Sequence, residues 1–163
     1  MRFTGIGKRE NYNIDEMDGR VLAVDVGARR VGLAISDASC TLARPLETIT
    51  VTSDADAVDR VTRRIHELVD EDGGLATIVV GMPTHLDGTP SPQTSRVAAF
   101  VERLKARTSL TIATEGERLS SREAESRLAL HERDWRKRKK KLDAAAAAVI
   151  LQDYLDRERR TTT

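Results

Sequence analysis

The chain has 163 residues, of which 33% are charged and 39% hydrophobic, and its net charge is +1 at pH 7. This length and composition are typical of one globular domain and exclude a disordered or membrane-embedded chain. The longest apolar run covers residues 144–151, and a membrane-spanning helix needs ~20 residues. The N-terminus has no apolar segment of the kind found in signal peptides, so we expect a cytoplasmic protein with no membrane partner.

The first half of the chain predicts strands. Residues 21–26 and 31–36 are apolar and rich in Val and Ile, which indicates two antiparallel strands joined by a turn at Gly27. Gly32 lies inside the second of these strands, where a residue without a side chain indicates a close approach by another part of the chain. A third strand is predicted at residues 44–50.

Helices and strands then alternate. Apolar residues recur at helical spacing over residues 54–70, and an unbroken apolar run at 77–83 predicts a buried parallel strand. A second helix is predicted over residues 93–107, and the alternating segment 109–119 predicts the fifth strand. Together these elements indicate an α/β fold with a five-stranded mixed sheet, three antiparallel strands followed by two parallel ones, flanked by helices.

Two more helices complete the predicted domain. A capping box at its start predicts a helix over residues 120–131, and an alanine-rich segment predicts the last helix over 142–157. We expect residues 1–20 to form a flexible extension, 21–158 a single domain and 159–163 a disordered tail.

Three carboxylates lie where predicted elements end. Asp25 is in the first strand, Glu117 at the end of the fifth strand, and Asp143 at the start of the last helix. Ligands of α/β sheets gather at the carboxyl ends of the strands, so Asp25 and Glu117 are expected at one edge, within reach of Asp143. Clustered carboxylates repel one another unless cations neutralise them, and hard divalent ions such as Mg²⁺ bind through oxygen ligands.

Each carboxylate also has an ordinary structural explanation. Asp25 could begin a turn and accept hydrogen bonds from the backbone N–H groups of residues 27–29. Asp143 could be only a helix N-cap, stabilised by the helix dipole. Glu117 could form an ion pair with Arg118. The spacing of the three residues does not decide between these alternatives.

Positive charge is concentrated at residues 133–141, where seven of nine residues are Lys or Arg and one is Asp. Such a segment can hold a polyanion even when the whole protein is nearly neutral. A solvated loop without a partner is the alternative, but a position next to Asp143 favours phosphate binding. Trp135, inside this segment, could stack on a base or anchor the segment to the core.

Five short motifs together resemble the YqgF/RuvX family of RNase H-like proteins, which are described as Holliday junction resolvases or pre-16S rRNA nucleases. They follow the family's order and spacing over most of the chain. The motifs read DVGARRVG at 25–32, VGMP at 80–83, DGT at 87–89, ERLSSREA at 117–124 and KLDAAAAAVIL at 141–151.

The resemblance implies an RNase H-like fold and a nuclease that uses Mg²⁺ or Mn²⁺ to hydrolyse the phosphodiester backbone. It implies Asp25, Glu117 and Asp143 as the catalytic metal ligands, in a site with one metal ion or two. The sequence departs from the family at Gly116, where the family has an acid. Glu115, on the same strand face as Glu117, could compensate for that acid.

The implied substrate is RNA, with maturation of the 5′ end of the 16S rRNA precursor as the favoured role. Branched DNA, cut by a Holliday junction resolvase acting as a symmetric dimer, is one alternative, and a non-catalytic nucleic-acid or ribosome-associated binding module is another. The chain is expected to be a monomer or a homodimer. The residues expected to bind nucleic acid are Arg29, Arg30, Arg118, Arg136, Lys137, Arg138, Lys139, Lys140 and Lys141.

Overall fold

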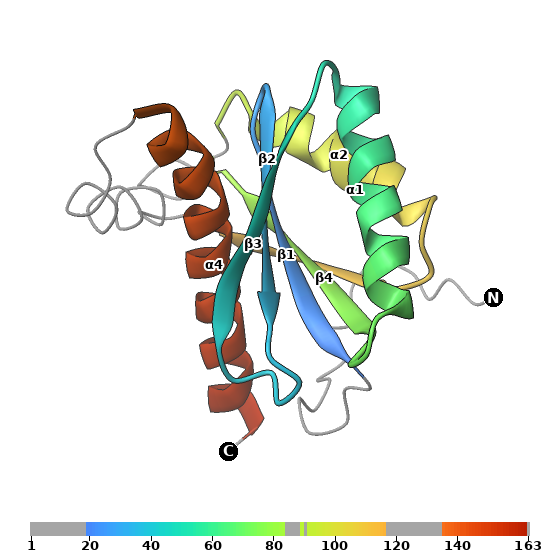
Figure 1. Cartoon of the computed structure of the whole chain (residues 1–163), viewed down its shortest axis with the longest axis vertical. Helices are drawn as coiled ribbons and strands as arrows, with labels where there is room; N and C mark the ends of the chain where they lie inside the picture. Colours follow the sequence, from blue (N-terminus) through green and yellow to red (C-terminus); the bar gives the residue numbers. More distant parts are fainter. Residues whose placement is uncertain (1–18, 84–88, 90, 117–134, 163) are drawn as a thin grey trace.

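Five strands form one mixed sheet in the order β3-β2-β1-β4-β5 (Figure 1). In this computed structural model the described residues are 19–83, 89, 91–116 and 135–162. Strand β1 pairs antiparallel with β2 and parallel with β4, β2 pairs antiparallel with β3, and β4 pairs parallel with β5. The strands are β1 Arg20–Val26, β2 Arg30–Ser36, β3 Ala43–Thr50, β4 Leu75–Met82 and β5 Thr111–Gly116. The predicted sheet is therefore confirmed in both its strands and its mixed pairing.

Within the described residues, three helices cover the two faces of this sheet (Figure 1). Helices α1 (Asp54–Asp70) and α2 (Thr94–Lys105) pack on one face, and α4 (Trp135–Thr162) packs on the other. The alternation of side chains along β1 produces two cores. Leu22 and Val24 belong to the core beneath α1 and α2, whereas Val21 and Ala23 belong to the core beneath α4.

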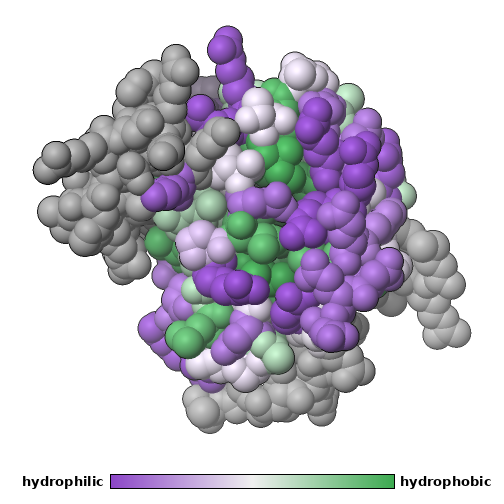
Figure 2. All heavy atoms as spheres, viewed as in Figure 1, coloured by the Kyte–Doolittle hydropathy of each residue, from purple (hydrophilic) through white to green (hydrophobic). Residues whose placement is uncertain are grey.

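Helix α1 begins where its sequence predicts. The hydroxyl oxygen of Ser53 accepts a hydrogen bond of 3.0 Å from the backbone N–H of Asp56, which satisfies one of the unpaired donors of the first turn. Figure 2 shows hydrophilic residues concentrated over α1, with apolar residues gathered near the centre of the view, along the edge strand β3. Within the described ranges, no helix is long and apolar enough to cross a membrane.

The last helix differs from its prediction at both ends. Helix α4 begins at Trp135 rather than at residue 142, so the basic segment is helical from that residue onward instead of forming a loop. Lys and Arg are good helix formers, and they continue directly into the alanine-rich segment. The helix also continues to Thr162, so a disordered tail from residue 159 is wrong for the described residues. The predicted helix at 120–131 lies outside the described residues.

The N-terminal boundary differs by a smaller amount. Arg20, which we expected in a flexible extension, is the first residue of β1. Its guanidinium donates a hydrogen bond of 3.0 Å to the carbonyl of Gly74 and pairs with Glu71 at 3.3 Å. These bonds fix the start of β1 against the loop that follows α1. Residues 1–18 lie outside the described residues.

Candidate functional site

Asp25 lies near the carboxyl end of β1, on the face of the sheet that α4 covers. Val21 and Ala23 pack beneath α4, and the two-residue period of a strand places Asp25 on the same face. Its side chain is half-buried, and its partner on the neighbouring antiparallel strand is Gly32. Placing a charged carboxylate here costs less desolvation free energy than placing one in the core, because the last residues of the strand are partly exposed to solvent.

Helix α4 makes direct backbone contact with the sheet at Gly32. A Cβ atom at this position would collide with the carbonyl oxygen and carbon of Asp143. The close approach predicted from Gly32 is therefore real, and its partner is the backbone of α4. Paired residues of an antiparallel ladder point to the same face, so Asp25 and the backbone of Asp143 both lie next to Gly32 on this face. The structure thus brings these two predicted site residues together.

An arginine binds the Asp143 carboxylate. The Nε of Arg30 donates to Oδ2 of Asp143 at 2.7 Å, and the two side chains are 34% and 27% exposed. Arg30 lies two residues before Gly32 on β2 and so shares its face. Asp143 lies well inside α4, which excludes the alternative that it is only a helix N-cap. Arg30, expected to bind phosphate, is instead paired with an expected metal ligand.

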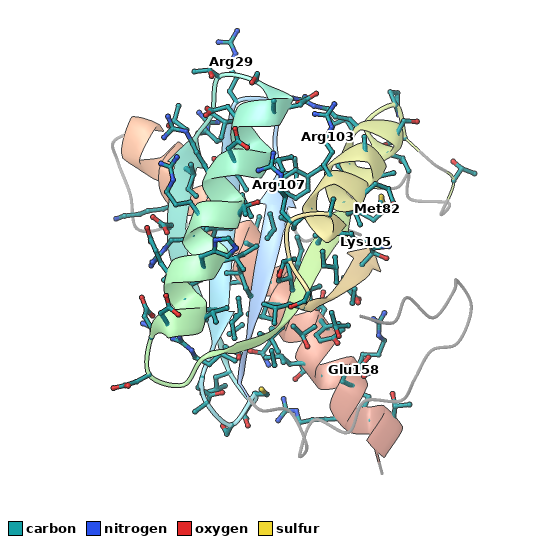
Figure 3. The ribbon with its side chains drawn as sticks, turned by 90° about the vertical axis from the view of Figure 1, so that its right-hand side faces the viewer. Arg29, Met82, Arg103, Lys105, Arg107 and Glu158 are labelled. Atoms are coloured by element: carbon teal, nitrogen blue, oxygen red, sulfur yellow. The ribbon has the colours of Figure 1, made fainter. Side chains whose placement is uncertain are left out.

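The remaining predicted residues are distributed around this site. Arg29 is exposed at the tip of the turn between β1 and β2 (Figure 3), and Lys141 is exposed on α4 close to Asp143. Glu117 and Arg118 lie outside the described residues. The residues at 136–140 are within α4, but their side chains also lie outside the described part of the chain. The structure therefore brings Asp25, Asp143 and Arg30 together and leaves the position of Glu117 as a prediction.

Sequence reasoning missed Arg96, which fixes the turn that follows Asp25. From α2, its Nη2 donates to the carbonyl of Ala28 at 3.2 Å, and its Nε donates to Asp54 at 2.8 Å. The turn is also closed by a hydrogen bond of 2.9 Å from the backbone N–H of Gly27 to the carbonyl of Arg30. No local motif marks Arg96, because its partners are far away in the sequence. Its bonds hold the strand end that carries Asp25.

Glu115 pairs with an arginine near the C-terminal end of α4. It is 9% exposed at the end of β5, and its Oε2 is within ion-pair distance of Arg157, although the angle does not make a hydrogen bond. Burial raises the pKa of Glu115, Arg157 opposes the shift, and Asp153 and Glu158 add to it. Arg157 lies about 20 Å from Asp143 along α4, at ~1.5 Å per residue. Glu115 therefore forms its ion pair with the C-terminal half of α4. The strand registers place it level with Asp25 on the same face of the sheet, two strands away, so its compensation for the family's acid stays a prediction.

The described side chains offer part of what a divalent ion needs. No group of three or more His, Cys, Asp or Glu side chains in the described ranges is arranged to hold a metal. Asp25 and Asp143 supply two carboxylates on one half-exposed face of the sheet. Mg²⁺ commonly binds through one or two carboxylates and keeps several waters. The two aspartates fit such an ion, and Arg30 already supplies a positive partner to one of them.

The order of strands, with an acidic residue on the first strand and another on the terminal helix, defines an RNase H-like α/β protein. The sequence matches the family described as "RuvX: Holliday junction resolvase" over residues 19–157. The chain therefore belongs to the RuvX family, a family of nucleases, as its five motifs indicate.

Curated relatives carry a consistent name. A protein of Geobacillus kaustophilus named "Putative pre-16S rRNA nuclease" is 39% identical over 140 residues, covering 86% of this chain and 99% of the relative. Relatives with the same name from Desulforudis audaxviator and Desulforamulus reducens are 35% and 39% identical over 137 residues, which is 84% of this chain in both cases. The match covers 94% and 96% of those two proteins.

A solved structure confirms the fold. Thermus thermophilus RuvC, solved in complex with a Holliday junction substrate, superposes with a TM-score of 0.53 at 15% identity. The superposition covers 88% of this chain and 97% of RuvC. The predicted RNase H-like architecture is thus confirmed by both pairing order and structural similarity.

Proposed function

We propose that this protein is a divalent-metal-dependent nuclease that hydrolyses phosphodiester bonds of RNA during maturation of the 16S rRNA precursor. The observation that carries the proposal is the position of Asp25 and of the Asp143 backbone next to Gly32, on one face of the sheet. Carboxylates that gather at one site are stabilised by a bound cation. The name shared by the curated relatives supports the choice of substrate.

Asp25, Asp143 and Glu117 would hold Mg²⁺ or Mn²⁺. A bound ion of this kind supplies Lewis-acid stabilisation of the phosphate and lowers the pKa of a water molecule. The chain's own cations perform a different task. Arg29, on the exposed turn, and Lys141, on α4, would bind phosphate oxygens on either side of the scissile bond. The basic start of α4 would continue this contact along the nucleic acid.

A nuclease assay with Mg²⁺ or Mn²⁺ on a 16S rRNA precursor fragment tests the proposal. Asp25→Asn and Asp143→Asn should each reduce cleavage by about two orders of magnitude or more, as loss of a group that stabilises the transition state does. Asp70→Asn is the matched control, because Asp70 is exposed at the end of α1, on the opposite face. Full activity of Asp25→Asn would remove this residue from the mechanism.

The family's description favours a second candidate, a Holliday junction resolvase. A synthetic four-way DNA junction, assayed beside the RNA fragment, separates the two substrates. Symmetric cleavage of the junction, together with a dimer in solution, would favour the resolvase. Cleavage of the RNA alone would favour the precursor nuclease. Binding of RNA without divalent-dependent cleavage would identify a non-catalytic binding module and contradict the proposal.

A further inference from the structure

The ion pair between Arg30 and Asp143 joins two groups with competing partners. The Arg30 Nε lies 2.7 Å from Oδ2 of Asp143, which is the carboxylate that the proposed function assigns to a divalent ion. A guanidinium and a divalent cation repel each other and bind the same carboxylate oxygens. Both side chains are partly exposed, 34% and 27%, so solvent ions can reach the pair.

We propose that Arg30 changes partners when the divalent ion binds. Without metal it bonds Asp143, and once the ion occupies this carboxylate, Arg30 is released to bind a phosphate oxygen of the nucleic acid. The inference rests on the proposed function, because it assigns Asp143 to the metal. It adds that Arg30 is a positioning residue that links metal binding to substrate binding.

The local structure suits such an exchange. Arg30 extends from the first residue of β2, a strand held on both sides by β1 and β3, so its backbone stays fixed while its long side chain reorients. A partly exposed ion pair contributes little free energy, so breaking it costs little. The planar guanidinium with its several donors is well suited to phosphate. Arg29, the neighbouring arginine, is exposed on the same turn and provides a natural comparison.

Thermodynamic linkage gives the exchange a measurable form. If metal binding frees Arg30 for the nucleic acid, metal must raise the affinity for RNA, and RNA must raise the affinity for metal by the same factor. Removing Arg30 should therefore strengthen metal binding, because a competitor is gone. It should also weaken RNA binding only when metal is present. Removing Arg29 should weaken RNA binding by the same factor with and without metal.

The test measures Mn²⁺ affinity by titration calorimetry, and RNA affinity by fluorescence anisotropy with and without Mn²⁺. The RNA is a labelled 12-mer, 2′-O-methylated and checked to be intact after each measurement. The full chain is compared with Arg30→Gln, Arg30→Lys and Arg29→Gln. We expect Arg30→Gln to bind Mn²⁺ at least about fivefold more tightly than the wild type does, a factor at the lower end of common coupling factors. Arg30→Lys, which keeps the charge, should stay close to the wild type.

Two results would overturn the exchange. The first is equal Mn²⁺ affinity of Arg30→Gln and the wild type. The second is that Arg30→Gln weakens RNA binding by the same factor with and without Mn²⁺, which would make Arg30 a phosphate ligand that does not depend on the metal. A wild-type chain that binds no Mn²⁺ would overturn the proposed function and the exchange together. Should Arg30→Gln fail to fold, as judged by circular dichroism, Arg30→Met, which also removes the charge, provides the same comparison.

Discussion

The carbonyl oxygen of Asp143 occupies the space that a side chain at Gly32 would fill. This contact lets the backbone of α4 rest directly on β2, and it places Asp143 beside the strand pair that carries Asp25. The same contact brings Asp143 within hydrogen-bond distance of Arg30. One residue without a side chain thus determines the geometry of the whole candidate site.

Gly32→Ala should destabilise the protein and reduce nuclease activity. The added methyl group must displace α4, and overpacking of this kind costs about 1–3 kcal/mol of unfolding free energy, occasionally more. In a chain of this size each kcal/mol lowers the melting temperature by about 2–4 °C. Thermal unfolding followed by circular dichroism measures the loss, and the precursor assay measures the activity.

Gly116→Ala is the control for this substitution. A Cβ atom at Gly116 meets no atom of the described residues within 4 Å. We therefore expect a stability change within about 0.5 kcal/mol, as for an unconstrained surface site. Equal losses at both positions would show that the effect at Gly32 is not steric.

Neutralising the start of α4 should weaken RNA binding and flatten its salt dependence. The variant replaces the five basic residues at 136–140 with Gln, which preserves the helix because Gln is a good helix former. Each phosphate of a single strand that the protein no longer neutralises reduces the slope of log K against log salt by about 0.7. Anisotropy titrations at several salt concentrations measure this slope.

A variant with Arg63→Gln and Arg103→Gln tests whether loss of positive charge elsewhere on the surface has the same effect. Both arginines are exposed on the helices of the opposite face, and Figure 3 shows Arg103 on α2. We expect the salt dependence of this variant to stay close to the wild type. A slope unchanged in the variant of residues 136–140 would indicate that the basic segment does not contact phosphate.

Glu115→Gln should stabilise the protein at neutral pH. Burial raises the pKa of Glu115 above its ordinary value of 4.5 in the folded state, so the folded protein holds this proton to a higher pH than the unfolded chain does. Its contribution to stability is therefore fully present below pH 4.5 and decreases as the pH rises through the folded pKa. Glutamine mimics the protonated form at every pH, so the variant does not lose this stability as the pH rises.

Urea unfolding between pH 4 and pH 8 checks this dependence. The difference between Glu115→Gln and the wild type should be largest at pH 8 and should decrease toward pH 4. Glu102→Gln is the control, because the side chain of Glu102 is 74% exposed on α2. A destabilised Glu115→Gln at pH 8 would show that the ion pair with Arg157 outweighs the cost of burial.

Tyr154→Phe should remove a tyrosine that ionises only in strong alkali. Burial between α4 and the sheet, with Glu158 adding to the effect, raises the pKa of Tyr154 to about 12. Its contribution to stability is present below the ordinary value of 10 and is lost as the pH rises toward the folded pKa. Absorbance of tyrosinate at high pH measures the missing step, and loss of a step near pH 10 rather than near pH 12 would contradict the assigned burial.

The sequence predicted the sheet well, because its signals are local. Apolar residues dominate β1, β2 and β4, and the capping serine at residue 53 marks the start of α1. The start of α4 was misjudged for a physical reason. The prediction began the helix with the alanine-rich segment at residue 142, but the helix propensity of Lys and Arg and their continuity with that segment extend it back to Trp135.

The site itself was only partly predictable. Asp25 and Asp143 were identified from motifs, and Gly32 indicated a close approach without naming its partner. The bond between Arg30 and Asp143 joins residues 113 positions apart, which no local pattern encodes. Glu115, a candidate to compensate for the acid absent at Gly116, forms an ion pair with Arg157 that no local pattern predicts.

The long separation of Asp25 and Asp143 in the sequence has a consequence for biosynthesis. A ribosome completes β1, with Asp25, long before it adds the helix that rests on Gly32. A nascent chain therefore displays half of a carboxylate pair while its translating ribosome, itself made of RNA, is close by. The second half arrives only with α4, after all five strands of the sheet have been made, so the order of synthesis delays assembly of the site.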